Sequence, residues 1–551
     1  MKKWTVFGLT VMLLVSVVSV AMGVSLMGEV TANELMGNVI EIRTWEDLHN
    51  MRDDLAGSYR LMNDLGPEDP GYHDYASDQA NGGEGWLRVG YDGGSFRGTF
   101  DGQNHTITGL YIDRTTRNLG MFGYVGSSGE VRNIGLVDVD MSWTGWGSGT
   151  VGGLVGRNEG TVSNSYATGQ ISDSSMSGAG GLVGRNYGTV NNSYASVNLS
   201  GHRYVGGLVG DNYGTVDNSY ATGTVSGDRY VGGLVGYNRG SVSNSYATGT
   251  VNGDEEVGGL VGTNSQGTVS NAYAIGYVSG DRNVGGLVGL NRGSTVYNTY
   301  ATGDVTGNVN VGGLVGQSHR SISGDTVSVG TVSNSYATGN VSGNRLLGGL
   351  VGQNHRSKVS NSYATGTATR LSGDSEYVGG FTGRNYQGKI IHCYSTASLH
   401  YEGVADPTDK GFAGVVETGG EYEVTGNFWD VEISGQTSTA GNATGRTTAE
   451  MMDISKFSDA GWDIVTVATP NNRDNDYIWN IVDGETYPFL SSILPDDGLP
   501  DDNGDDDSPA PGILMFMISM VFALAFYMKK GLNDKDPMEE KATQRDDRRF
   551  D

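Results

Sequence analysis

Cysteine, proline and positive charge are all scarce in this chain. Ten prolines among 551 residues exclude a collagen or polyproline protein, and a single cysteine cannot form a disulfide within the chain. Lys and Arg number 35 against 62 Asp and Glu, which gives a net charge of −27. A nucleic acid is a polyanion and needs a basic surface, so we expect no nucleic-acid partner.

Motifs of catalysis and metal binding are also missing. The eight histidines are scattered without metal-ligand spacing beside a carboxylate, and no HExxH, GxSxG, P-loop or GxGxxG sequence stands in its usual context. We therefore expect no catalytic residue, no metal and no cofactor. The alternative is a polysaccharide lyase or hydrolase, which needs several acidic side chains at one level of the fold. The acidic residues of this sequence do not cluster in that way.

The chain is rich in one hexapeptide, VGGLVG or a close variant, which occurs nine times between residues 151 and 383. The intervals are 28, 26, 26, 26, 27, 27, 36 and 31 residues. A fixed period of this size indicates a stacked array, because a unit so small cannot bury its own apolar face.

One repeat, residues 231–256, shows which secondary structure the array contains. Val242, Asn244 and Tyr246 alternate with serines, and short strand-like stretches are separated by glycine turns. Glycine and β-branched residues dominate and no 3.6-residue apolar period exists, which excludes a helical repeat. We predict an all-β fold, a right-handed parallel β-helix.

Aligned repeats predict columns of like residues about 4.8 Å apart. We expect valine to face inward, with asparagine two residues on and tyrosine four residues on along the same strand, both stacked into ladders. The serine positions between them, with Cys393 in place of one serine, are expected to face outward. A second asparagine column is expected at turns that need a left-handed residue: Asn158, Asn186, Asn212, Asn238, Asn264, Asn291, Asn354 and Asn385.

Both ends of the chain carry segments typical of export and anchoring. Two lysines precede an apolar run, so we expect a signal peptide over residues 1–32. Residues 495–511 form an acidic Pro/Gly/Asp linker, and the apolar stretch 512–530 is predicted to cross the membrane as a helix. By the positive-inside bias the tail, residues 531–551, lies in the cytoplasm and the body outside the cell.

The G-L-V-G core followed by N-S-Y-A-T-G resembles the GLUG motif. Residues 118–123 (NLGMFG) and 409–414 (DKGFAG) resemble degenerate first and last members, which makes about eleven coils. Residues 96–112 and 427–453 resemble the flanking coils of the same family. The acidic linker with its apolar stretch resembles the C-terminal anchors of archaeal surface proteins.

The resemblance implies a secreted or surface protein of archaea or bacteria. Some proteins with this motif are metalloproteases, but their zinc chemistry sits in another domain, and without HExxH that activity is not implied here. Residues 44–56 are predicted to form a capping helix that begins with Thr44 as its N-cap. The expected body comprises an N-terminal cap with entering strands, the GLUG-repeat β-helix and a C-terminal cap, at residues 33–100, 101–440 and 441–494.

Two places outside the ladders are candidates for recognition. A charged column precedes each VGG and forms a candidate ligand stripe, with arginine for carboxylate or sulfate and tyrosine for sugar: Arg203, Tyr204, Arg229, Tyr230, Arg282 and Arg345. The other reading of this column is a solvated ladder of opposite charges. The 36-residue interval contains an insertion that is predicted to project as a recognition loop, with His319, Arg320 and Asp325.

The sequence favours a membrane-anchored cell-surface β-helix that acts without catalysis. We expect a role in adhesion, in the cell envelope or in partner interaction, with a surface glycan or protein as the partner. The polysaccharide-active enzyme on the same scaffold is the alternative.

Overall fold

The computed structural model describes residues 39–493, except 92–93, 144, 146–148, 174–177, 373–376 and 421. The chain divides into two units, Met1–Leu494 and Pro495–Asp551. The predicted signal peptide, acidic linker, membrane helix and cytoplasmic tail lie outside the described residues. Among the residues that are described, no helix has the length and apolar character needed to cross a membrane.

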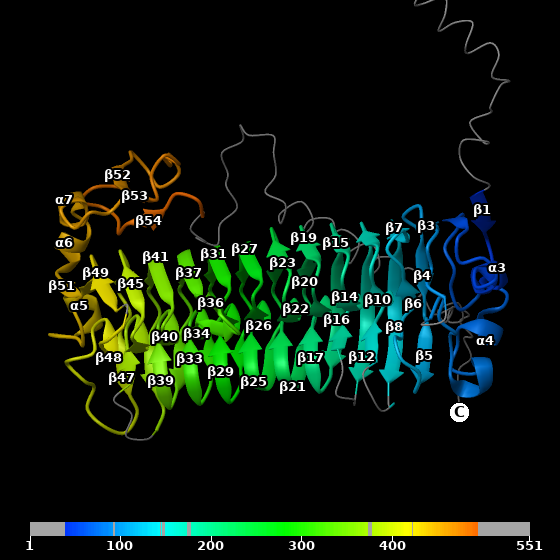
Figure 1. Ribbon diagram of the computed structural model, residues 1–551, viewed down its shortest axis with the longest axis horizontal. Helices are drawn as coiled ribbons and strands as arrows, with labels where there is room; N and C mark the ends of the chain where they lie inside the picture. The colour runs from blue at the N-terminus through cyan, green and yellow to red at the C-terminus, as the bar shows by residue number, and fades with distance from the viewer. Residues whose placement is uncertain are drawn as a thin grey trace, which may run out of the picture. The chain divides into compact units, whose positions relative to one another are not determined.

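The body is a parallel β-solenoid of about eleven turns, as Figure 1 shows from the side. One turn consists of β22 (Val235–Asn238), β23 (Ser241–Ser243), β24 (Tyr246–Ala247) and β25 (Val251–Gly258), and each strand pairs in parallel with its equivalent one turn away. The prediction of an all-β parallel stack is confirmed. Its right-handed sense stays a prediction.

One face of the solenoid is an eleven-stranded parallel sheet. Each strand begins at the fifth residue of a GLUG-like hexapeptide and continues beyond it, and residues 118–123 and 409–414 contribute to the first and last strands in the same way. In order they are β6 (Phe122–Val125), β10 (Val155–Asn158), β14 (Val183–Asn186), β18 (Val209–Asn212), β22, β26 (Val261–Ser265), β30 (Val288–Arg292), β34 (Val315–His319), β40 (Val351–His355), β44 (Thr382–Tyr386) and β48 (Ala413–Glu417).

The other faces belong to a second, larger sheet. In each turn of the solenoid, one row of this sheet comes directly after the eleven-stranded sheet along the chain. Its strands are β7 (Glu130–Arg132), β11 (Thr161–Ser163), β15 (Thr189–Asn191), β19 (Thr215–Asp217), β23, β27 (Thr268–Ala274), β31 (Thr295–Ala301), β37 (Thr331–Ala337), β41 (Lys358–Ala364) and β45 (Lys389–Ile391). Another row contains the VGG segments: β9 (Thr150–Gly152), β13 (Gly178–Gly180), β17 (Arg203–Gly206), β21 (Val225–Gly232), β25, β29 (Arg282–Gly285), β33 (Val309–Gly312), β39 (Arg345–Gly348) and β43 (Val378–Gly379).

Valine and leucine columns fill the inside of the stack. The valine column from Val162 to Val359 and the leucines of the GLVG cores are fully buried. Glycine is required where the chain turns between them, because a Cβ on Gly207 would lie 2.1 Å from the carbonyl oxygen of Gly233 in the next turn. The repeat thus needs both its apolar and its glycine positions.

The second asparagine column, expected at left-handed turns, is instead a buried ladder. All eight of its asparagines are fully buried, and the Nδ2 of seven of them donates to the next residue of the column at 2.8–3.3 Å. The last, Asn385, donates to the Gly388 carbonyl oxygen at 3.1 Å. Ser318 replaces one asparagine and accepts from Asn291. The ladder satisfies amides that would be costly to bury alone.

The first asparagine column, expected on the same face as valine, takes the left-handed turn. Its φ angles are 48–52° and its side chains are exposed or half-exposed. A left-handed residue interrupts the two-residue alternation, so the serine that follows points inward. Ser193 and Ser219 are buried, and Ser219 Oγ accepts the Ser193 amide at 3.2 Å.

Cys393 occupies one of these inward serine positions. The expectation that it faces outward is wrong, because its side chain is fully buried. Its sulfur lies 3.3 Å from the carbonyl oxygen of Ile391, and burial raises the pKa of the thiol.

The tyrosine column forms the predicted ladder, with neighbouring rings 4.7–5.1 Å apart and nearly parallel. The rings lie on the outer surface rather than inward. From Tyr336 to Tyr394 they are buried, because the C-terminal segment packs over them with Trp462 and Trp479. That segment contains α5 (Val431–Ser434), α6 (Thr448–Met451), α7 (Ile454–Ser458), β52 (Ile464–Thr466), β53 (Trp479–Ile481) and β54 (Phe489–Leu490), and it lies along the flank of the last turns (Figure 1).

The predicted N-terminal helix is present and shorter than expected. It is α3 (Trp45–Asn50), and Thr44 and Asp47 form a capping box at its start. Trp45, Leu48 and Met51 are fully buried in the first part of the core.

Candidate ligand-binding surface

The outer face of the eleven-stranded sheet presents two parallel rows of polar and aromatic side chains. One row lies two residues after each strand's first valine or its equivalent: Tyr124, Arg157, Arg185, Asp211, Tyr237, Thr263, Leu290, Gln317, Gln353, Arg384 and Val415. The other row lies two residues further on and includes Ser265, Arg292, His319, His355, Tyr386 and Glu417. Because the buried asparagine stands between the rows, both keep their register from turn to turn.

Arginine, tyrosine and one buried carboxylate gather in the N-terminal half of this face. The guanidinium of Arg239 lies 5.3 Å from the ring of Tyr213 and 5.2 Å from that of Tyr237. Arg185 Nε donates to Asp211 Oδ2 at 3.0 Å. Burial raises the pKa of Asp211 to about 6, although Arg185 and Arg239 oppose the shift.

The predicted stripe begins on the neighbouring strands β17 and β21. Tyr204 and Tyr230 stack face to face at 4.8 Å, and the ring of Tyr237 meets both edge-on. One face of each of these two rings is therefore covered by the other tyrosine, which leaves less ring surface for stacking on a sugar. Arg229 lies over Tyr230 at 4.7 Å and approaches Glu256 Oε1 at 3.1 Å and Glu255 at 3.4 Å.

The remaining predicted stripe residues lie further along the same column. Arg203 pairs in register with Arg229, and Arg282 and Arg345 stand on either side of Val309. Arg282 and Arg345 are exposed. The structure thus brings Arg203, Arg229 and their tyrosines together, and leaves the other two arginines apart.

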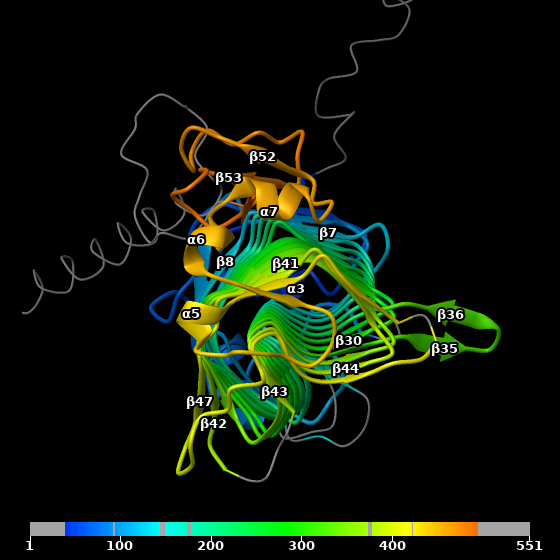
Figure 2. The same ribbon diagram turned by 90° about the vertical axis from the view of Figure 1, so that its left-hand side faces the viewer.

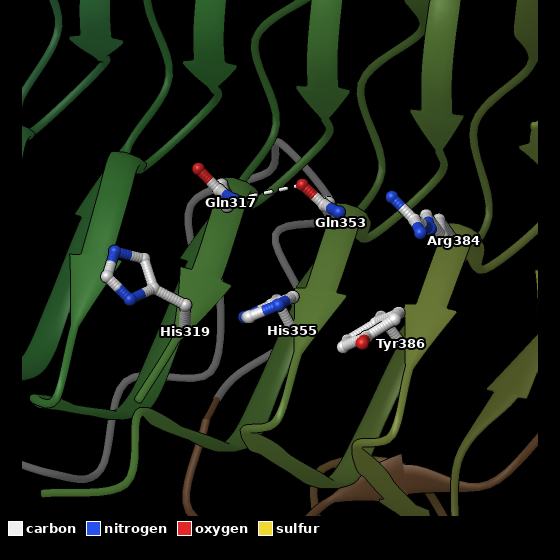
Figure 3. Close-up of a pocket in the computed structure, with 6 residues that line it drawn as sticks. All are labelled: Gln317, His319, Gln353, His355, Arg384 and Tyr386. Carbon is white, nitrogen blue, oxygen red and sulfur yellow. Dashed lines mark hydrogen bonds between the residues drawn. The ribbon is translucent and has the colours of Figure 1, made fainter. Parts of the chain in front are cut away.

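A groove of about 540 Å³ lies on the C-terminal half of the eleven-stranded sheet, over β34, β40 and β44. Figure 3 shows the residues that line it. Its lining residues come from three successive turns: Gln317, His319, Gln353, His355, Arg384 and Tyr386. Gln317 Nε2 donates to Gln353 Oε1 at 2.9 Å, and the rings of His355 and Tyr386 stack at 4.7 Å. None of the six is a carboxylate.

Positive charge surrounds this groove. Burial lowers the pKa of His355, and the charges of Arg356, His319, Arg384 and Arg320 lower it further. Burial also lowers the pKa of His319, where Arg292 adds to the effect and a bond to the Arg320 carbonyl opposes it.

The four arginines around the groove differ in whether another side chain already binds them. Arg384 is held by Glu417, with Nε and Nη2 at 2.8 and 2.6 Å from Oε1. Arg356 donates to Gln387 Oε1 at 2.9 Å. Arg292 and Arg320 form no ion pair with any residue in the described part of the chain.

The predicted recognition loop is a β-hairpin beside the groove. β35 (Ser321–Ser323) and β36 (Thr326–Ser328) are antiparallel and project from the body (Figure 2). Gly324 has φ +57°, as the first central residue of a type II′ turn requires, and Asp325 is the second. His319 belongs to the groove, Arg320 joins it to the hairpin, and Asp325 lies at the tip.

Five of the six groove residues were missed in the sequence analysis. The signal was the pair of positions on either side of the buried asparagine, in GQSH, GQNH and GRNY. These positions vary between repeats, whereas the positions that stay constant form the core and its ladders. Across the described ranges, no three His, Cys, Asp or Glu side chains gather closely enough to hold a metal ion.

Six stretches match the sequence profile of the family described as "The GLUG motif": residues 147–172, 201–226, 227–252, 280–306, 343–369 and 374–399. The chain contains GLUG repeats. The last two of these GLUG repeats include β40 and β44, which carry four of the six groove residues.

Two curated proteins resemble part of the GLUG-repeat chain. A "Putative Gly-rich membrane protein" of Evansella cellulosilytica is 34% identical over 126 residues, which is 22% of this chain and 14% of that protein. "Halomucin" of Haloquadratum walsbyi is 33% identical over 85 residues, which is 15% of this chain and 1% of that protein. The matches thus cover only a small part of either relative.

Proposed function

We propose that this protein is a cell-surface β-solenoid that binds an envelope component or a partner through the outer face of its eleven-stranded sheet, without catalysis. The observation that carries the proposal is the groove over β34, β40 and β44, with the hairpin β35–β36 projecting beside it. The side chains of this face vary from turn to turn, whereas the valine, asparagine and tyrosine columns repeat the same residue, so this face supports recognition better than the ladders do.

Three observations support a surface location. One relative is named a membrane protein and another halomucin. The chain begins with a signal-like apolar run and ends with an acidic linker, an apolar stretch and two lysines. A net charge of −27 suits a solvated outer surface.

The lining of the groove also supports binding rather than hydrolysis. Glycosidic cleavage needs an acid and a base or nucleophile, usually two carboxylates across the substrate. The six lining residues supply none, and the carboxylate of Glu417 nearby is bound to Arg384.

The test combines location with binding. Intact cells that express the full chain are treated with protease, and the body is expected to be lost while the C-terminal tail stays protected. The purified full chain in detergent is then applied to a glycan and envelope-extract array, and reaction products are assayed by mass spectrometry. Protection of the body from protease would contradict the surface location, and shortened glycans would favour the enzyme.

A further inference from the structure

We propose that the groove over β34, β40 and β44 binds an acidic oligosaccharide, one that carries carboxylate or sulfate groups. The inference rests on the proposed function only in taking this sheet face as a binding surface. It adds the ligand class, the site and the residues.

Charge is the first argument. The protein as a whole carries −27, yet Arg292, Arg320, Arg356 and Arg384 surround the groove. Two carboxylates oppose them, Glu417, which is paired with Arg384, and Glu256, whose charge acts on His319. Arg292 and Arg320 keep their charges free of ion pairs with described residues. Such a local reversal of sign attracts an anion against the net charge of the molecule.

The lining chemistry is the second argument, and it separates a glycan from an acidic peptide. The paired amides of Gln317 and Gln353 can both donate to and accept from hydroxyl groups, and the Tyr386 hydroxyl and the His355 ring can do the same. A bound peptide uses a free strand edge, apolar side-chain pockets or, for an acidic motif, an arginine cluster, and polyaspartate tests this last mode. The strands β34, β40 and β44 are paired on both sides, and each of the six lining side chains carries an amide, imidazole, guanidinium or hydroxyl group, so a hydroxyl-rich anion fits better than an added strand or an apolar segment.

Geometry is the third argument. The three lining rungs are Gln317 with His319, Gln353 with His355, and Arg384 with Tyr386, on consecutive strands in register. A sugar chain laid along the solenoid axis would meet one rung for each strand spacing of about 4.8 Å. The hairpin β35–β36 stands beside the first rung, because Arg320 directly links it to His319.

The experiment is titration calorimetry on the full chain with three probes of equal length: an oligogalacturonate, a sulfated oligosaccharide and a neutral oligosaccharide. We expect an acidic probe to bind, the neutral probe to bind at least about tenfold more weakly, and salt to weaken the acidic complex. The double variant Arg292→Ala/Arg320→Ala should lower the affinity about tenfold or more, because two charge-assisted contacts are lost.

Two further variants keep the test decisive. Gln353→Glu preserves an acceptor for Gln317 but places a negative charge in the groove, so it should also lower the affinity for acidic probes. Arg97→Ala/Arg117→Ala removes the same charge from exposed arginines outside the groove and should leave binding unchanged. Unchanged thermal midpoints would exclude unfolding as the cause.

Three results would overturn the inference: equal affinity for the neutral probe, equal loss in the control variant, or polyaspartate binding as tightly as the acidic sugars. Failure of the two proposals can be told apart. A chain that is exposed on cells and binds envelope extract unaffected by Gln353→Glu contradicts only the ligand and site. A chain that binds acidic sugars in vitro but is protected on intact cells contradicts only the surface function.

Discussion

At the scale of the residue, the two asparagine columns have the same amide group but different structural roles. The column at Asn238 is fully buried, and its side chain donates to Asn264 Oδ1 at 2.9 Å and accepts from Asn212 at 2.8 Å. The column at Asn244 lies at the surface with φ +49°. The first column contributes hydrogen bonds inside the stack, and the second contributes a backbone conformation.

Asn238→Ala should therefore destabilise the protein more than Asn244→Ala. Loss of Asn238 leaves buried donors and acceptors unpaired, and we expect a drop of about 3 kcal/mol in the free energy of unfolding. Asn244→Ala costs about 1 kcal/mol through its left-handed backbone. Urea denaturation measures both, and Asn238→Ser, which imitates the natural Ser318, should lose less than the alanine variant. Equal losses at the two sites would contradict the assignment of roles.

Asp211 makes stability depend on pH. Its folded-state pKa of about 6 lies above the value of about 3.9 for an unfolded aspartate, so the folded protein binds this proton more tightly. The cost of burying the charge is absent below about pH 4 and is present in full above about pH 6, so stability falls as pH rises through this window.

Asp211→Asn carries no charge and should lack this dependence. Relative to the unmodified protein, its free energy of unfolding should rise by about 2 kcal/mol between pH 4 and pH 7. Urea denaturation at several pH values measures the difference, with Asp254→Asn at an exposed position as the control. A difference that stays constant over this range would argue that the Arg185 pair outweighs burial.

At the scale of the element, the hairpin β35–β36 is an addition to a turn that is otherwise complete. His319 pairs with Arg292 and Thr331 pairs with Thr295, so eleven residues stand where the previous turn has two. Ile322 and Val327 oppose each other on the hairpin and are 56% and 53% exposed. Because these apolar side chains are not in the core, the hairpin adds little to the stability of the stack.

Removal of residues 320–328 should leave the solenoid folded. The deletion reduces the 36-residue interval to the 27 residues of the preceding turn, and Val329→Gly supplies the flexibility that Gly293 has at φ +58°. We expect a thermal midpoint within about 3 °C of the intact chain, because no apolar core side chain is lost and, apart from Ser321, the deleted residues are exposed or half-buried. Calorimetry checks this, and a larger fall would mean that the hairpin is part of the stack.

At the scale of the whole molecule, the described body is a series of turns that contact mainly their neighbours. Stability in such an array is approximately a sum of local terms, so a destabilising substitution in one turn affects mainly that turn and its neighbours. The C-terminal segment is the exception to the repeat, since it covers Tyr336, Tyr363 and Tyr394 with its own aromatic cluster. Without this cover the same tyrosines would be half-exposed, as the equivalent rings from Tyr166 to Tyr300 are.

Trp479→Ala should release this segment without unfolding the solenoid. Trp479 is fully buried and lies 4.7 Å from Trp462, 5.9 Å from Tyr394 and 6.1 Å from Tyr363. Removing so large a buried side chain costs about 3–5 kcal/mol. Hydrogen exchange should rise in residues 447–493 and stay low in turns 150–300, while Tyr277→Ala, at an exposed ring, changes neither. Faster exchange throughout would contradict local stability.

The repeat period, the parallel β stack, the valine and tyrosine ladders and the N-cap at Thr44 could be predicted from the amino-acid sequence, because each depends on local pattern or on like residues meeting one turn apart. The tertiary structure decided which asparagine is buried, since the left-handed turn at Asn164 and its equivalents shifts the inward and outward alternation by one residue. It also decided the groove, because Gln317, Gln353 and Arg384 are separated by 36 and 31 residues and meet only when three turns stack in register.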